Sequence, residues 1–140
     1  MNPIERLLKY VTIRTPSDEY SDTVPSSACQ FELAQHLCRE LFTMGITDVK
    51  VDTQCYLYAH IPPSPGCEGR PALGFIAHLD TVSDFCSQRI CPELHEDYNG
   101  RELPLGSSGR VLSPEMFPHL KDLKGRTLIT SDGTTILGAD

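Results

Sequence analysis

The sequence predicts an α/β fold. Two helical patterns come first, a pair of short strand patterns follows, and a nearly continuous apolar run comes after them. The 140 residues are enough for one small domain with a core. A hydrophobic content of 39% and a charged content of 22% are typical of a globular protein, while eleven prolines and ten glycines indicate a large share of loop.

The first helix is predicted over Pro3–Arg14. Apolar residues recur there at the spacing of one helix face, namely Ile4, Leu7, Leu8 and Val11. Asn2 is a favourable capping residue, and Pro3 suits the first helical position. The helix is expected to end before Thr15-Pro16, because a residue that precedes proline disfavours the helical conformation.

The second helix is the clearest element of the sequence. Ser27 and Gln30 form a capping-box pattern at its start, and Gly45 supplies a stop at its end. Between them runs one apolar stripe, formed by Phe31, Ala34, Leu37, Cys38, Leu41 and Met44.

Strand patterns occupy three further regions. Val49–Val51 and Tyr56–Ile61 predict an antiparallel pair. Pro71–Ala77 is almost entirely apolar, which predicts a central strand covered on both faces. Thr127–Ser131 and Thr134–Leu137 flank an Asp-Gly pair, which is a strong hairpin signal.

Charge and targeting signals exclude several classes of function. A net charge of −7 argues against nucleic acid or an anionic membrane as a partner. The N-terminus has no apolar signal-peptide core, and no stretch is long and apolar enough for a membrane span, so we expect a cytoplasmic protein. The six cysteines form no Cys-x-x-Cys pair, so we expect reduced thiols rather than disulfides or structural zinc.

A histidine and an aspartate lie at the end of the predicted central strand. His78 and Asp80 are two residues apart, so on a strand both side chains address the same face. The carboxyl ends of strands in open α/β sheets are where ligands bind. The residue types alone favour a structural histidine–carboxylate pair. The position at the end of a buried strand shifts the balance toward a metal-binding imidazole with a carboxylate that orients it.

A third candidate is Asp140, which follows Leu137-Gly138-Ala139 after the predicted hairpin. Its carboxylate could bridge two metal ions, or it could cap a helix. Imidazole and carboxylate ligands suit zinc, cobalt or manganese. These residues alone cannot complete a two-metal site, so other ligands must come from elsewhere.

Four segments together resemble a known family. They are Ala77–Thr81, Leu112–Pro118, Thr127–Gly133 and Leu137–Asp140. With them the chain resembles the N-terminal part of the peptidase T family of tripeptide aminopeptidases, within the two-zinc aminoacylase and carboxypeptidase superfamily. The His-x-Asp-Thr element is shared across the superfamily, whereas the Leu-Ser-Pro-x-Met-Phe-Pro segment is typical of peptidase T. The resemblance implies that residues 1–140 form the N-terminal portion of the catalytic domain, with a mixed sheet flanked by helices.

The resemblance also implies roles for the candidate residues. His78 would be a ligand of one zinc ion, Asp80 would be the active-site residue that orients it, and Asp140 would bridge two zinc ions. The implied reaction is zinc-dependent hydrolysis that releases the N-terminal residue of a tripeptide. The full-length protein would be a homodimer, joined through an inserted domain.

Family members continue beyond the bridging aspartate. They carry an Asp-Lys-Ala-Gly segment, a Glu-Glu pair with the general base, another aspartate, a distal histidine and an inserted domain, none of which is in this sequence. We therefore expect an N-terminal fragment that neither binds two zinc ions tightly nor hydrolyses peptides alone, and that exposes an apolar face. The alternatives are another exopeptidase or deacylase of the superfamily, and a non-catalytic interaction module with the same fold.

Overall fold

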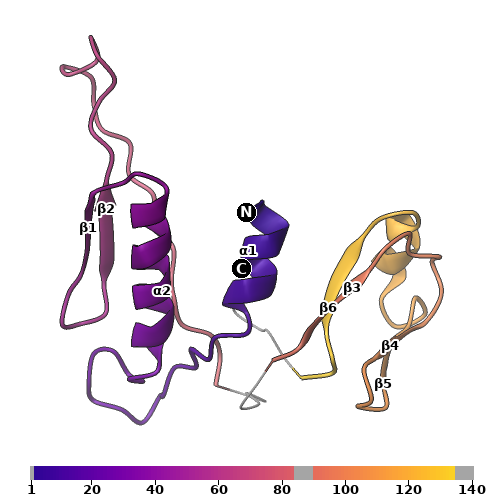
Figure 1. Ribbon diagram of the computed structural model, residues 1–140. Coiled ribbons are helices and arrows are strands. Elements are labelled where there is room, and N and C mark those ends of the chain that lie inside the picture. The colour runs from indigo at the N-terminus through magenta and orange to yellow at the C-terminus, as the bar shows by residue number, and fades with distance from the viewer. Residues whose placement is uncertain (1, 84–89, 135–140) are drawn as a thin grey trace. The chain divides into compact units, whose positions relative to one another are not determined.

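The computed structural model describes residues 2–83 and 90–134 (Figure 1). Its contacts divide the chain into two compact units. One unit is Thr15–Thr81, and the other combines the residues up to Arg14 with those from Val82 onward. Both units contain helices and strands, so the predicted α/β character is confirmed. Within the described ranges, no helix combines the length and the apolar character needed to cross a membrane.

The unit Thr15–Thr81 is built from one helix and one strand pair. Helix α2 (Gln30–Thr43) packs against β1 (Asp48–Val51) and, over a smaller area, against β2 (Leu57–His60). The two strands are antiparallel, as predicted, and Asp48 lies opposite His60 in their register. In Figure 1 the helix runs alongside this hairpin.

The two ends of α2 differ in how well the sequence predicted them. Gly45 follows the helix with φ +91°, a left-handed conformation that glycine adopts without strain, which confirms the stop signal. The predicted cap at Ser27 is wrong, because the N-cap residue is Cys29 and no side chain caps the helix. The physical reason is that the Gln30 side chain turns away from the helix start and donates to the carbonyl oxygen of Pro16.

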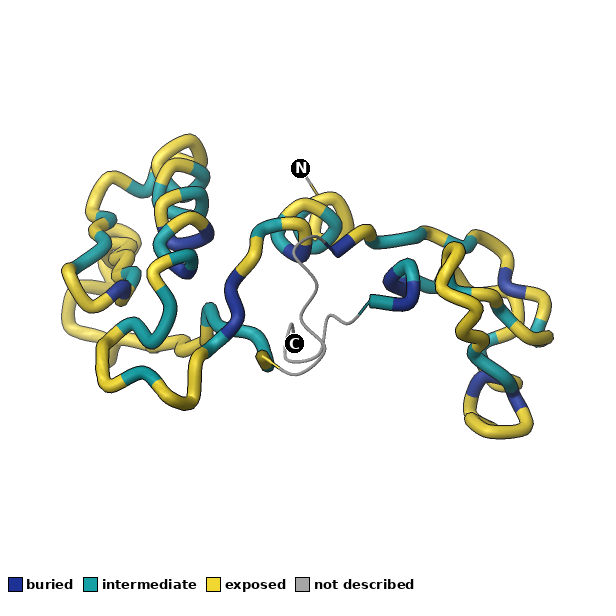
Figure 2. The backbone as a smooth tube through the Cα atoms, turned by 90° about the horizontal axis from the view of Figure 1, so that it is seen from below, coloured by how far each residue is buried: buried dark blue, intermediate teal, exposed yellow. Residues whose placement is uncertain are grey.

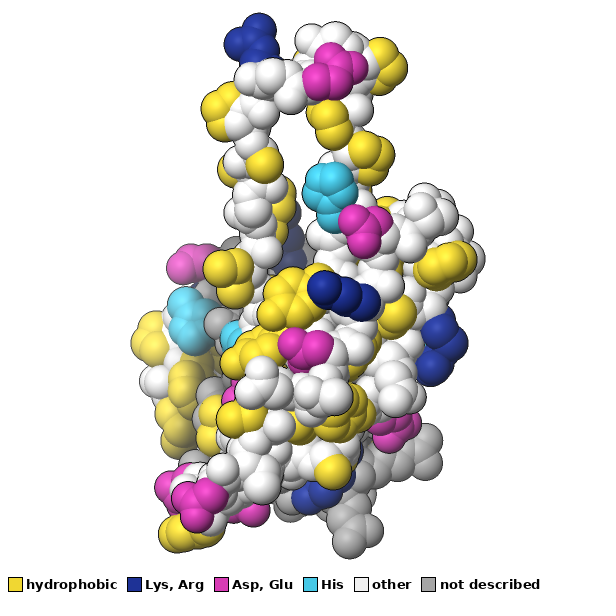
Figure 3. Space-filling model, turned by 90° about the vertical axis from the view of Figure 1, so that its left-hand side faces the viewer, with side chains coloured by type: hydrophobic (Ala, Val, Ile, Leu, Met, Phe, Trp, Pro, Cys, Tyr) yellow, Lys and Arg dark blue, Asp and Glu magenta, His cyan; other side chains and the backbone are white. Residues whose placement is uncertain are grey.

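The predicted central strand Pro71–Ala77 does not form a strand in this structure. Among the described residues, none makes a backbone hydrogen bond with it, and a strand is defined by such bonds. Its large apolar side chains are almost fully exposed, at 81% for Leu73, 89% for Phe75 and 102% for Ile76. The expected exposed apolar face is therefore present. Residues 61–77 form a projecting loop between β2 and His78, and Figure 3 shows hydrophobic side chains along both of its limbs.

The described residues of the second unit form one α-helix, one short 3-10 helix and two small sheets. Its elements are α1 (Pro3–Tyr10), β3 (Pro92–His95), β4 (Leu103–Leu105), β5 (Arg110–Leu112), η1 (Pro118–Leu123) and β6 (Leu128–Ser131). Strand β3 pairs with β6, and β4 pairs with β5, both antiparallel. Few positions in either unit are fully buried (Figure 2); the buried hydrophobic residues here are Val11, Ile90, Tyr98 and Leu120.

Helix α1 is shorter than the predicted range Pro3–Arg14. The Asn2 cap is confirmed, because its side chain accepts from the Glu5 N–H, and the Glu5 carboxylate accepts from the Asn2 N–H. Beyond Tyr10 the chain tightens, since the N–H groups of Thr12 and Ile13 each bond a carbonyl three residues back. The helix ends there, before the chain reaches the extended residues that follow Arg14.

Of the hairpin predicted around the Asp-Gly pair, the first strand is present as β6, and the chain bends after it at residues 132–134. Gly133 has φ +96°, and the Asp132 carboxylate accepts from the Thr134 N–H. The hydroxyl of Thr134 holds the pKa of Asp132 below its usual value. The partner of β6 in the described structure is β3, which the sequence did not indicate, and the predicted second strand beyond Thr134 lies outside the described residues.

Candidate metal centre

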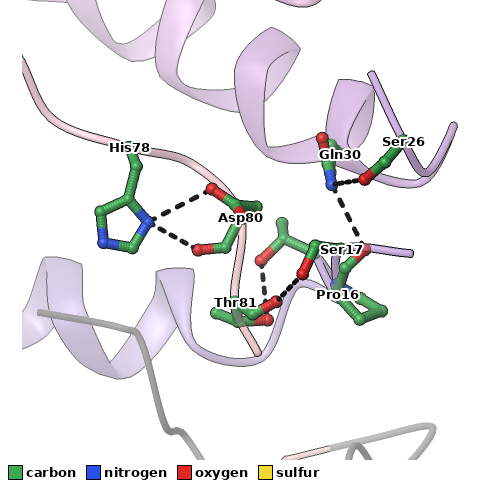
Figure 4. A network of polar contacts seen from close by, with 8 residues as sticks. Pro16, Ser17, Ser26, Gln30, His78, Asp80 and Thr81 are labelled. Carbon is green, nitrogen blue, oxygen red and sulfur yellow. Dashed lines mark hydrogen bonds and ion pairs between the residues drawn. The ribbon is translucent and has the colours of Figure 1, made fainter. Parts of the chain in front are cut away.

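His78 and Asp80 lie together at the end of the extended segment. The His78 Nδ1 atom is 3.4 Å from the Asp80 Oδ1 atom and 2.7 Å from the backbone carbonyl oxygen of Asp80 (Figure 4). A carbonyl oxygen can only accept a hydrogen bond, so the Nδ1 atom must carry the hydrogen. In the neutral ring the lone pair is then on Nε2.

This arrangement suits a zinc ligand. Histidines that bind metals usually donate their other ring N–H to a carboxylate or a backbone carbonyl, which fixes the tautomer and the ring orientation. Here Asp80 supplies both kinds of acceptor, and the donor set of imidazole nitrogen and carboxylate oxygen is one that zinc accepts. His78 would hold the ion through Nε2, while Asp80 would lie on the opposite side of the ring.

The centre is incomplete within the part of the chain that the structure describes. Residues 2–83 and 90–134 contain no group of three or more histidine, cysteine, aspartate or glutamate side chains that could hold a metal ion. The third predicted site residue, Asp140, lies outside the described residues. The structure therefore brings together two of the three predicted site residues.

A short backbone bridge holds the end of this segment. The Thr81 N–H donates to the Thr15 carbonyl oxygen at 2.8 Å, and the Ser17 N–H donates to the Thr81 carbonyl oxygen at 2.9 Å. These two bonds form a parallel bridge between Pro16 and Thr81. The Ser17 hydroxyl adds a contact of 3.2 Å to the same Thr81 carbonyl. Residues far apart in sequence thus meet directly beside the His78–Asp80 pair.

The bridge is tied to helix α2 by a buried amide. The Gln30 Nε2 atom donates to the Pro16 carbonyl oxygen at 3.3 Å and lies 3.5 Å from the Ser26 hydroxyl (Figure 4). Gln30 is only 7% exposed and Thr15 only 2%, so both are buried polar residues with partners.

Sequence reasoning missed this network because it assigned Gln30 to a capping box. The sequence does contain a signal that Gln30 is buried. Gln30 lies four residues before Ala34 and seven before Leu37, on the apolar face of the helix. A glutamine on that face indicates a buried hydrogen-bond partner.

Three other histidines in the described part of the chain have acidic neighbours. On α2, the His36 Nε2 atom is 3.7 Å from the Glu40 carboxylate. His60 and Asp48 face each other across β1 and β2, with Nδ1 and Oδ2 3.4 Å apart. The His95 Nε2 atom on β3 is 2.9 Å from the Thr130 hydroxyl and 3.7 Å from the Glu93 carboxylate. Among the described residues, neither the His60 pair nor the His95 pair has the backbone carbonyl contact found at His78, so both keep the structural interpretation.

Sequence comparison finds similar proteins that carry the name Peptidase T. The chain is 44% identical to a protein named Peptidase T from Alkaliphilus oremlandii over 99% of its own length and 34% of that protein. It is 46% identical to Peptidase T from Exiguobacterium sp. and 44% identical to Peptidase T from Bacillus cereus, in each case over 98% of the chain and 33% of the relative. No family model matches. The chain spans about a third of the length of the curated relatives it matches.

Proposed function

We propose that this chain belongs to the peptidase T family and supplies part of the two-zinc site of a tripeptide aminopeptidase. The observation that carries the proposal is the contact between the His78 Nδ1 atom and the Asp80 carbonyl oxygen, at 2.7 Å, in a chain 44–46% identical to Peptidase T over nearly all its length. The His78–Asp80 contact alone would suit a structural pair, and the similarity to Peptidase T alone identifies no ligand. Together they favour His78 as a metal ligand whose tautomer is fixed by Asp80.

The residues of this chain have separate roles in the proposal. His78 would hold one zinc ion through Nε2, and Asp80 would hold the Nδ1–H so that the ring keeps that orientation. Asp140, which lies outside the described residues, would be the bridging carboxylate ligand. The chemistry that zinc ions supply when bound is activation of water and polarisation of the scissile carbonyl. Residues 2–83 and 90–134 contain no group of three or more potential ligands, so the proposal takes the general base and the remaining ligands from elsewhere.

The rest of the proposal rests on the similarity. The substrate would be a tripeptide, hydrolysed at its first peptide bond, and the full-length enzyme would be a cytoplasmic homodimer. The 140 residues would form the N-terminal portion of the catalytic domain. The two alternatives are another exopeptidase or deacylase of the superfamily and a non-catalytic module.

The test is a chimera in which this chain replaces the matching third of the Exiguobacterium Peptidase T, with which it shares 46% identity. We expect the chimera to release the N-terminal residue from a tripeptide and to lose this activity when zinc is chelated. A folded chimera that is inactive with zinc present would contradict the proposal and favour the non-catalytic module.

A second measurement addresses the isolated chain. We expect calorimetry to find no tight binding of two zinc ions, because the described residues hold no cluster of three ligands. Submicromolar binding of two ions, or turnover of a tripeptide by the isolated chain, would contradict this expectation.

A further inference from the structure

The tautomer of His78 depends on the orientation of a single peptide plane. The carbonyl group of Asp80 and the N–H of Thr81 belong to the same peptide unit, which is planar and rigid. One end of this unit accepts the hydrogen bond from His78 Nδ1 at 2.7 Å. The other end donates to the Thr15 carbonyl oxygen at 2.8 Å. If the second bond is lost, the plane can rotate and the first bond is no longer enforced.

The segment that receives this bond is itself fixed. Thr15 and Pro16 are buried, and the Ser17 N–H returns a bond to the Thr81 carbonyl. Gln30 then ties the Pro16 carbonyl to the first turn of α2. We call these five residues the backbone clamp: Thr15, Pro16, Ser17, Gln30 and Thr81. All of it lies within the unit Thr15–Thr81.

We propose that Ser17 and Gln30 are positioning residues for the zinc-binding histidine. They hold the peptide between Asp80 and Thr81 in the orientation that keeps the hydrogen on His78 Nδ1 and the lone pair on Nε2. This inference rests on the proposed function, because a defined tautomer matters only if His78 binds a metal. Neither residue touches the metal or the substrate, so both act through the backbone.

The test uses the 140-residue chain labelled with ¹⁵N, and it reads the ring nitrogens of the histidines at pH 8.5. Gln30→Leu removes the bond to Pro16, and Ser17→Pro removes the N–H that bonds Thr81. Ser17→Ala is the matched control, since it keeps that N–H and loses only the hydroxyl contact. His60 is an internal control. Its nitrogen is 3.4 Å from Asp48, the same distance as between His78 and Asp80, and among the described residues it contacts none of the backbone clamp.

We expect wild-type His78 to be held in the Nδ1–H tautomer. Gln30→Leu and Ser17→Pro should both shift His78 toward the mixed tautomers of an unconstrained imidazole, while Ser17→Ala and the His60 signals stay unchanged. In the Peptidase T chimera titrated with Zn²⁺ alone, the apparent affinity should fall about 10-fold when the first two substitutions are introduced, the low end of the effect of outer partners on metal sites.

The outcomes separate the two proposals. An unchanged His78 tautomer in both variants would overturn the positioning role and leave the proposed function standing. Loss of the helical circular dichroism signal in Gln30→Leu would make Gln30 a folding residue, which also contradicts the positioning role. If wild-type His78 shows the fixed tautomer but the folded chimera is inactive with zinc present, the proposed function fails and the backbone clamp remains.

Discussion

Two histidine–aspartate pairs in this protein have the same separation and different surroundings. The nitrogen–oxygen distance is 3.4 Å both for His78 with Asp80 and for His60 with Asp48. His60 and Asp48 meet across a strand pair, and their side chains are 65% and 73% exposed. His78 and Asp80 are neighbours along one segment, and their side chains are 49% and 47% exposed. Ion-pair distance alone therefore does not distinguish a candidate metal ligand from a surface pair.

The two pairs differ in whether the histidine ring also contacts the backbone. At His78 the ring contacts a carbonyl as well as a carboxylate, and the peptide that carries this carbonyl is bonded on its other side to Thr15. At His60 the contact is to a flexible side chain. A carboxylate can accept from a ring in several orientations, whereas a fixed carbonyl selects one orientation and one tautomer. Backbone anchoring thus gives a common residue pair a defined ring orientation and tautomer.

The largest expected effect comes from removing each histidine in turn in the Peptidase T chimera. His78→Ala removes a proposed zinc ligand, so tripeptide hydrolysis should fall by more than the roughly 10–100-fold loss typical of an outer partner. His60→Ala should leave activity within about 2-fold of the parent, because removing an exposed pair changes stability by about 1 kcal/mol or less. The measurement is kcat/KM for a tripeptide together with bound zinc per chain. Equal losses in the two variants would remove the distinction between the pairs.

A smaller effect is expected for the two aspartates. Asp80→Asn removes the carboxylate charge but keeps the backbone carbonyl that accepts from His78 at 2.7 Å. We therefore expect zinc affinity in the chimera to fall by about 10-fold, the lower end of the range for outer partners. Asp48→Asn is the matched control and should leave zinc affinity unchanged. A loss far above 100-fold at Asp80 would indicate that its carboxylate binds the metal directly.

Local sequence signals predicted the local structure well. The Asn2 cap, the glycine stop after α2 and the antiparallel pair of β1 and β2 all depend on residues close together in the chain, and all are present. The proximity of His78 and Asp80 follows from their spacing of two residues alone, because the strand on which the prediction placed them does not form.

Contacts between distant residues were not predicted. The bridge from Thr81 to Thr15 joins positions 66 residues apart through backbone atoms, which carry no sequence signal. The pairing of β6 with β3 is of the same kind. The strand expected at Pro71–Ala77 fails for a related reason. Its composition indicates burial on both faces, but burial requires neighbours, and the described residues supply none.

The smallest expected effect concerns the stability of the His60–Asp48 pair itself. Asp48→Asn should change the free energy of unfolding by less than about 1 kcal/mol, because both groups are exposed and water screens their attraction. Urea unfolding at pH 5.5 in low salt and in 1 M NaCl measures this directly, and the small difference should disappear in salt as the screening length falls to about 3 Å. A salt-independent loss above about 2 kcal/mol would show that the cross-strand pair anchors β1 to β2. In that case His60 would be as firmly held as His78, and anchoring would no longer support the proposal of His78 alone as a metal ligand.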